Sequence, residues 1–228
     1  PDRRPSGKRE HQIEHGSPNL PVIEAMVQRY QQVAVKLSPG VDFRLIPFDA
    51  EIELISHHGR CKQAVAWTGS FRTAIRRATV LPGGQTISAA TESELSWPAV
   101  KPIEAGHYLL EPDAAVIRAN LVGVLARKLE CHIIDPHIAW LVSDGPVQSP
   151  FVNSFQVIDV IPFAAKKLRA WLAGHEVGSV DIKTRGTAFE PEDLARRLKL
   201  SGHRHVILLI TRLGSSPVAI LGERYHHK

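Results

Sequence analysis

The chain has 228 residues and a formal net charge of +5, and 43% of its residues are apolar, 22% charged and 6% aromatic. This composition is that of an ordinary globular protein and excludes a disordered, collagen-like or fibrous chain. No uncharged apolar run approaches the roughly 18 residues that a membrane helix needs. We therefore expect a soluble, cytoplasmic protein that does not contact a membrane.

The two cysteines, Cys61 and Cys131, are too few for a disulfide framework and favour a reducing compartment. The first 16 residues are polar throughout and contain no apolar core of a signal peptide. The only methionine, Met26, lies inside a helical pattern rather than at the start of the chain. We therefore expect this chain to be a piece of a longer one.

The N-terminal part of the chain predicts an α/β unit. After a polar loop over residues 1–17, Ser17-Pro18-Asn19 is expected to cap an amphipathic helix. The predicted elements are a helix over 20–32, a short strand over 33–37 that Ser38-Pro39-Gly40 ends, a hairpin over 51–69 that turns at Gly59, a strand over 77–81, and a loop or sheet edge over 83–100. A helix that leads directly into a strand is typical of α/β proteins.

The C-terminal part predicts a separate small module. A helix is expected from Ala114 to Leu129 with Asp113 as its N-cap, and residues 145–150 resemble a linker. Beyond them, the predicted elements are a strand over 155–161, a helix over 164–172, a strand over 179–184, a helix over 191–200, and strands over 206–211 and 217–222. This β-α-β-α-β-β order indicates an α+β module that folds separately from what precedes it.

The positive charge is concentrated in that module. Residues 1–151 hold 16 Lys and Arg against 16 Asp and Glu, and residues 152–228 hold 12 against 7. A basic excess suits a polyanionic partner such as RNA, although a solvated basic face is the alternative. The candidate phosphate contacts are Lys183 and Arg185 at a strand end, with Lys166, Lys167, Arg196 and Arg197 on the two helices as secondary ones. These cations can line one face, or they can pair with helix acids such as Glu192 and Asp193.

Motifs for other chemistry are missing from the sequence. It contains no glycine-rich nucleotide loop, no esterase elbow and no zinc-protease or paired C-x-x-C pattern. The one cluster of metal-type residues, over Cys131–His137, fits no closed zinc site. Asp135-Pro136 within it reads better as a turn in which the carboxylate caps backbone N–H groups, and we predict no bound metal.

Five short segments, taken together, resemble a known bacterial family. They are Pro1-Asp2-Arg3-Arg4, Lys36-Leu-Ser-Pro-Gly40, Tyr108-Leu-Leu-Glu-Pro-Asp113, Asp135-Pro-His-Ile-Ala139 and Ile182-Lys-Thr-Arg-Gly186. In this order they are similar to class I S-adenosylmethionine-dependent methyltransferase-like proteins that carry a C-terminal THUMP-like domain. The resemblance spans nearly the whole chain, and it places these residues after the cofactor-binding glycine loop of that family.

The resemblance implies a fold, a cofactor and a partner. Residues 1–104 would form the C-terminal half of a Rossmann-like methyltransferase sheet, residues 105–150 a helical connector, and residues 151–228 an α+β THUMP-like domain. S-adenosylmethionine would bind to the full-length parent, and tRNA or rRNA would be the partner. Arg3 and Arg4 would flank the methyl-transfer pocket as catalytic residues, and Ser38, Pro39 and Gly40 would shape its floor. The alternative is a non-catalytic RNA-binding or protein-interaction module on a methyltransferase scaffold.

Overall fold

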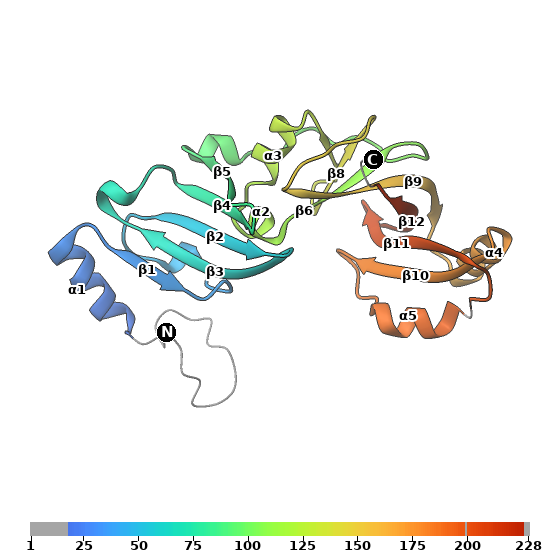
Figure 1. The fold of residues 1–228 in the computed structure, drawn as a ribbon, viewed down its shortest axis with the longest axis horizontal. Coiled ribbons are helices and arrows are strands. Elements are labelled where there is room, and N and C mark those ends of the chain that lie inside the picture. Colours follow the sequence, from blue (N-terminus) through green and yellow to red (C-terminus); the bar gives the residue numbers. More distant parts are fainter. Residues whose placement is uncertain (1–17, 199, 226–228) are drawn as a thin grey trace. The chain divides into compact units, whose positions relative to one another are not determined.

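The computed structural model describes residues 18–198 and 200–225 (Figure 1). The predicted catalytic residues Arg3 and Arg4 lie outside this range. The chain divides into two compact units, one containing the residues up to Ser96 together with Asp113–Leu125, and the other containing Trp97–Pro112 and the residues from Ala126 onward. Within the described ranges, no helix has the length and apolar character needed to cross a membrane.

The first unit is built on a five-stranded mixed sheet in the order β1-β3-β2-β4-β5. Its elements are α1 (Leu20–Tyr30), β1 (Ala34–Leu37), η2 (Phe43–Leu45), β2 (Glu51–His57), β3 (Arg60–Trp67), η3 (Gly69–Phe71), β4 (Arg76–Leu81), β5 (Gln85–Ala89), η4 (Glu92–Leu95) and α2 (Ala114–Arg118). All pairs are antiparallel except β2 with β4, and α2 packs against β2, β3 and β4.

The helix cap and the hairpin turn predicted for this unit are both present. The side chain of Asn19 caps α1 by accepting a hydrogen bond from the backbone N–H of Val22 at 3.4 Å. The β2–β3 hairpin turns through His58 and Gly59, whose φ values of 50° and 73° are the left-handed values that such a tight turn requires. The segment predicted as loop or sheet edge contains β5, which is one of the two edge strands of this sheet.

The helix predicted from Ala114 to Leu129 is interrupted. It forms α2, which ends at Arg118, and α3 (Val122–Lys128), separated by Asn120 at a φ of 59°. Asparagine tolerates the left-handed region better than most residues, so the break occurs at a residue that can adopt it. Asp113 caps α2 as predicted, its carboxylate accepting from the N–H of Ala115 at 2.8 Å.

The second unit is built on a seven-stranded mixed sheet in the order β10-β11-β12-β9-β6-β8-β7. Its elements are β6 (Tyr108–Pro112), β7 (His132–Asp135), β8 (Ile138–Ser143), β9 (Val152–Pro162), α4 (Ala165–Gly174), β10 (Val177–Thr184), α5 (Pro191–Leu198), β11 (Arg204–Leu213) and β12 (Ser216–Arg224). Only β10 and β11 pair in parallel.

Residues 105–150 differ from the helical connector that the sequence predicted. They contain three strands as well as helices, and β6 pairs with β9 over five residue pairs, so the sheet of the C-terminal module continues into them. The sequence signal for strands is weak here, because most residues of β7 and β8 are buried and their polar and apolar residues do not alternate.

Each face of the seven-stranded sheet has its own apolar core. On one face, which we call the helix face, Leu168 and Leu172 of α4 and Leu194 and Leu198 of α5 pack with alternate residues of β11 such as Leu208. On the other, inner face, the intervening residues of β11 pack with Trp140 of β8 and Phe155 of β9. The alternation of side chains along each strand therefore sorts the residues between two environments.

The sheet curls around its inner face until distant strands meet. Strands β10 and β6 are four positions apart, which in a flat sheet is about 19 Å. Yet the Nζ atom of Lys183 on β10 lies 2.8 Å from the Oε2 atom of Glu111 on β6. Gly186, at a φ of 68°, lies so close to Ile138 of β8 that an added Cβ would be 2.3 Å from its Cδ1 atom.

Asp135 joins two distant parts of the curled sheet by hydrogen bonds. Its carboxylate accepts one hydrogen bond from the N–H of His137, at 2.8 Å, and another from the N–H of Gly214 in the β11–β12 turn, at 2.7 Å. The first bond confirms the predicted capping turn, and the second joins β7 to a strand pair on the far side of the sheet. Burial alone would raise the pKa of Asp135, but these two donors and the charge of Arg212 lower it below its usual value.

We predict that Asp135→Asn lowers the free energy of unfolding of the chain at pH 7 by about 1–3 kcal/mol, because the two N–H groups donate to different carboxylate oxygens and an amide has only one oxygen to accept. Since the folded-state pKa is lowered, the contribution of the carboxylate is present above its ordinary pKa of 3.8 and is lost as the pH falls below it. Urea unfolding at several pH values measures this difference.

The matched control is Asp181→Asn, which changes an exposed carboxylate on β10. It is expected to leave stability almost unchanged. If the difference in the free energy of unfolding between Asp135→Asn and the wild type stays constant from pH 7 down to pH 3, the charge-based explanation is contradicted.

Candidate functional site

The loop after β1 lies where α/β sheets commonly bind ligands. Strands β1 and β2 both run antiparallel to β3, and Leu37 and Leu54 both pair with Ala64, so the carboxyl ends of β1 and β2 lie at the same edge. Ser38, Pro39 and Gly40 follow β1 at this edge and are half-buried. The structure therefore places these three residues at the carboxyl end of β1, where α/β folds commonly hold ligands, and their role in a pocket stays a prediction.

A tight turn fixes the shape of this loop. The N–H of Gly40 donates to the Oγ atom of Ser38 at 3.3 Å, and the N–H of Val41 donates to the Ser38 carbonyl at 3.1 Å. The serine therefore holds the backbone of the loop by accepting at both oxygens.

Two buried carboxylates in the first unit, missed by sequence reasoning, have structural partners. Glu51 is fully buried; its Oε2 atom accepts from the N–H groups of Thr73 and Ala74 at 2.6 and 2.9 Å, and its Oε1 atom lies 2.6 Å from the guanidinium of Arg77. Glu53 accepts from Trp67 and Thr79. Because their oxygens hold the segment between β3 and β4 and the neighbouring strands, these residues stabilise the unit.

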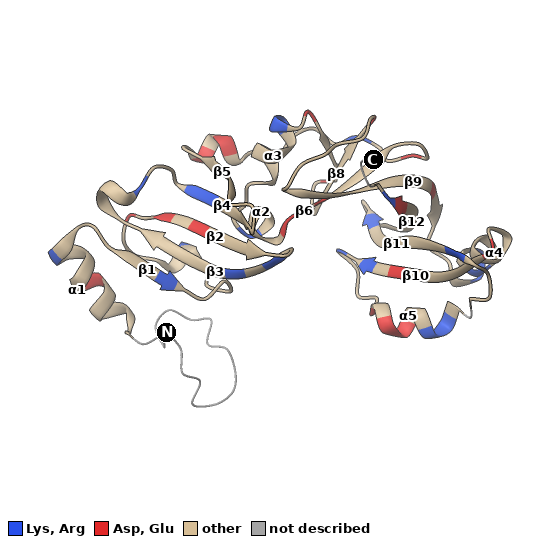
Figure 2. Ribbon diagram, viewed as in Figure 1, with Lys and Arg blue, Asp and Glu red and all other residues tan. Residues whose placement is uncertain are grey.

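The helix face of the second unit carries exposed cations. Lys166, Lys167 and Arg169 are exposed on α4, and Arg196 and Arg197 are exposed on α5. In Figure 2, α5 is acidic in its first turn and basic in its last. Arg196 forms an ion pair with Asp193, whereas Lys166, Lys167 and Arg197 have no charged partner among the described residues.

Lys183 and Arg185, the two main candidates for phosphate contacts, lie elsewhere. Val180 and Ile182 of β10 pack into the core of the helix face, so Lys183 points to the inner face. There it pairs with Glu111 and lies 5.8 Å from the centre of the Phe155 ring. The guanidinium of Arg185 lies 5.7 Å from the centre of the Trp140 ring. The six predicted cations therefore do not share one face.

Lys183 and Arg185 are also more buried than the cations on α4 and α5. Lys183 and Glu111 are only 30% and 15% exposed at their side chains. Burial lowers the pKa of Arg185 from its usual value. The exposed residues of α4 and α5 are thus more available to an external anion than the predicted main contacts.

The cysteine and histidine residues near Asp135 do not gather into a metal site. In the described part of the chain, no group of three or more His, Cys, Asp and Glu side chains is placed to hold a metal ion. Asp135 is occupied by backbone donors, and burial raises the pKa of the Cys131 thiol to about 11, which keeps it protonated at neutral pH.

Comparison with known proteins identifies one part of the second unit. Residues 152–224 match the family described as THUMP domain-like. Two proteins from Mycobacterium tuberculosis, from strains CDC 1551 / Oshkosh and ATCC 25618 / H37Rv, are each 33% identical over 225 residues, which is 96% of this chain and 60% of theirs. Both are named uncharacterized S-adenosylmethionine-dependent methyltransferases.

A solved structure shares the fold. The crystal structure of a protein from Porphyromonas gingivalis W83, provisionally named a methyltransferase, superposes with a TM-score of 0.76 at 21% identity, over 94% of this chain and 57% of that one. The chain is homologous to the two mycobacterial proteins named S-adenosylmethionine-dependent methyltransferases and contains a THUMP-like domain at residues 152–224, which confirms the predicted resemblance. It spans about 60% of the length of these mycobacterial relatives.

We predict that Lys183→Met lowers the free energy of unfolding by about 1–2 kcal/mol, because it leaves the mostly buried Glu111 carboxylate without its cation. The variant keeps the apolar stem of the lysine and removes only the charge. Thermal and urea unfolding measure the loss, and Lys166→Met, which removes an exposed charge on α4, is the control with no expected change. Equal stability of the two variants would show that the pair with Glu111 contributes nothing.

Proposed function

We propose that these 228 residues are a portion of a cytoplasmic, S-adenosylmethionine-dependent methyltransferase-like protein that acts on RNA, and that its THUMP-like domain holds the RNA. The observation that carries the RNA part is the set of exposed cations on the helix face of the second unit, most of which have no ion-pair partner among the described residues. Exposed lysine and arginine side chains on one face form the electrostatic footprint that a phosphate backbone needs.

The methyltransferase part rests on the first unit. Its α1, β1 and β2–β3 hairpin occur in the order expected for the end of a methyltransferase sheet. Strand β1 pairs only with β3, so its other edge is open among the described residues. Val22, Met26 and Tyr30, four residues apart on α1, are between 43% and 57% exposed. An open strand edge and an exposed apolar stripe on the same unit are both expected where a larger sheet continues.

Ser38, Pro39 and Gly40 are proposed to form the floor of the methyl-transfer pocket in that larger sheet. The chain itself lacks the glycine-rich loop and the ribose-binding acid through which the resembling family binds S-adenosylmethionine. The residues present therefore do not form a complete cofactor site, and we assign them no step in methyl transfer.

RNA binding by the helix face is tested with Lys166→Ala/Lys167→Ala in the 228-residue chain. We predict weaker binding to total bacterial tRNA and a decrease of up to about 2 in the slope of the logarithm of affinity against the logarithm of salt concentration, about one for each lost phosphate contact. A filter-binding titration at several salt concentrations provides both values.

The matched control is Arg60→Ala/Lys62→Ala, which removes two exposed cations from the β2–β3 hairpin of the first unit. It is expected to leave the slope unchanged. If the two double variants reduce the slope equally, net charge explains the binding and the helix face does not.

A further inference from the structure

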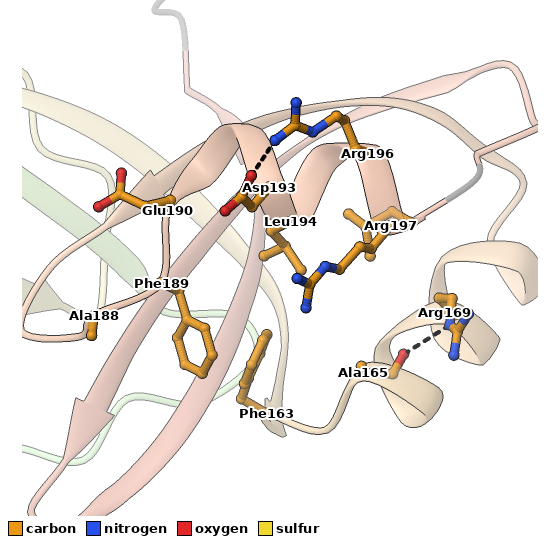
Figure 3. A pocket seen from close by; sticks show the side chains of 11 residues that line it. Phe163, Ala165, Arg169, Ala188, Phe189, Glu190, Asp193, Leu194, Arg196 and Arg197 are labelled. Carbon is orange, nitrogen blue, oxygen red and sulfur yellow. Dashed lines mark hydrogen bonds and ion pairs between the residues drawn. The ribbon is translucent and has the colours of Figure 1, made fainter.

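A cavity of about 580 Å³ lies on the helix face, between α4, α5 and the loop that joins β10 to α5 (Figure 3). Leu194 and Leu198 of α5 line it and are buried, at 7% and 4% exposure. Phe163, which follows β9, also lines it and packs against the core beneath. The volume is in the range of sites that hold a small ligand or one part of a larger ligand.

Two aromatic rings form one wall of the cavity. The rings of Phe163 and Phe189 are 4.5 Å apart at their centres and inclined by 53°. Phe189 is 41% exposed, although a phenyl ring of this size gains from burial. An exposed ring beside a cavity with an apolar base offers a face against which a flat ligand can stack.

Arginines line the same cavity. In Figure 3 the side chain of Arg197 extends on the side of the two phenyl rings, whereas Arg196 points away and pairs with Asp193. Arg169 of α4 also lines the cavity; its Nε atom donates to the carbonyl of Ala165 at 3.3 Å, which leaves its terminal amino groups for another acceptor. A planar guanidinium can bind a phosphate through two hydrogen bonds or stack on a base.

The carboxylates of the cavity limit where an anion can sit. Glu190 and Asp193 line it at the start of α5, and Asp193 is neutralised by Arg196. A phosphate is therefore favoured on the side of Arg197 and Arg169, away from Glu190.

We propose that this cavity binds a single unpaired nucleotide of an RNA strand, with the base against Phe189 and the phosphate on Arg197 and Arg169. The inference rests on the proposed RNA-binding function and adds which part of the RNA the domain recognises. A base inside a duplex is already stacked on both faces and does not reach an aromatic side chain, whereas an unpaired base does. Lys166 and Lys167 on α4 would hold the adjoining backbone.

The test compares variants at Phe189, which is exposed enough to be replaced without disturbing the core. Phe189→Leu keeps an apolar side chain but removes the ring face, and Phe189→Tyr keeps the ring. The probes are a fluorescein-labelled uridine decamer and a ten-base-pair RNA duplex, each titrated with the 228-residue chain and followed by anisotropy. We expect Phe189→Leu to weaken binding of the decamer about tenfold and leave the duplex unchanged, and Phe189→Tyr to bind like the wild type.

A photocrosslink provides an independent readout. A decamer with 4-thiouridine in place of uridine is irradiated with the wild-type chain, and the peptides are identified by mass spectrometry. Crosslinks at Phe189 or Phe163 support the proposal. Crosslinks confined to other elements would overturn it. So would a competition experiment in which polyglutamate displaces the decamer as effectively as unlabelled decamer does, because the site would then accept any polyanion.

The failure of this inference is distinguishable from failure of the proposed function. If Phe189→Leu binds the decamer like the wild type while Lys166→Ala/Lys167→Ala still weakens tRNA binding, the nucleotide pocket is wrong and RNA binding by the helix face stands. If the wild-type chain binds neither tRNA nor the decamer, the proposed function itself fails.

Discussion

The curl of the seven-stranded sheet is the constraint on which the second unit depends. Lys183 meets Glu111 across four strand positions, and the buried carboxylate of Asp135 joins β7 to the β11–β12 turn. These contacts exist only because the sheet folds around the apolar core of its inner face. Because that face is filled by the protein's own side chains, we propose the helix face of the second unit as the surface that meets a large partner.

This division assigns the basic residues to two roles. On the inner face, a cation such as Lys183 neutralises a carboxylate and stabilises the fold. On the helix face, cations such as Lys166 and Arg197 are exposed on helices whose apolar sides are anchored in the core, so their positions are fixed while their charges remain in solvent. The same face carries the cavity lined by Phe163 and Phe189. The exposed cations and the aromatic rings thus occur together on the helix face, which is the surface proposed to hold RNA.

Much of this arrangement follows from local sequence patterns, and the part that does not has a physical reason. Asn19, Gly59 and Asp113 act within a few residues of themselves, so their caps and turns were predictable. Side chains alternate between the two faces of a strand, so Lys183 points to the face opposite Ile182. The sequence could have predicted that this is the inner face only if it had also shown that α4 and α5 cover the Ile182 side of the sheet. Pairing of Asp135 with Gly214 joins residues 79 positions apart and leaves no local signal. Nor did the sequence show that β6 extends the sheet of the THUMP-like domain, because the pattern of a five-residue strand does not reveal its partner strand.

Hydrogen exchange of the 228-residue chain, with and without tRNA, tests most directly whether the helix face is the surface that meets RNA. The account predicts slower exchange on binding in α4 and in the segment from the end of β10 through α5, with no change in β7, β8 or the first unit. Protection found instead on the β6–β8 strands, with α4 and α5 exchanging as in the free chain, would contradict it.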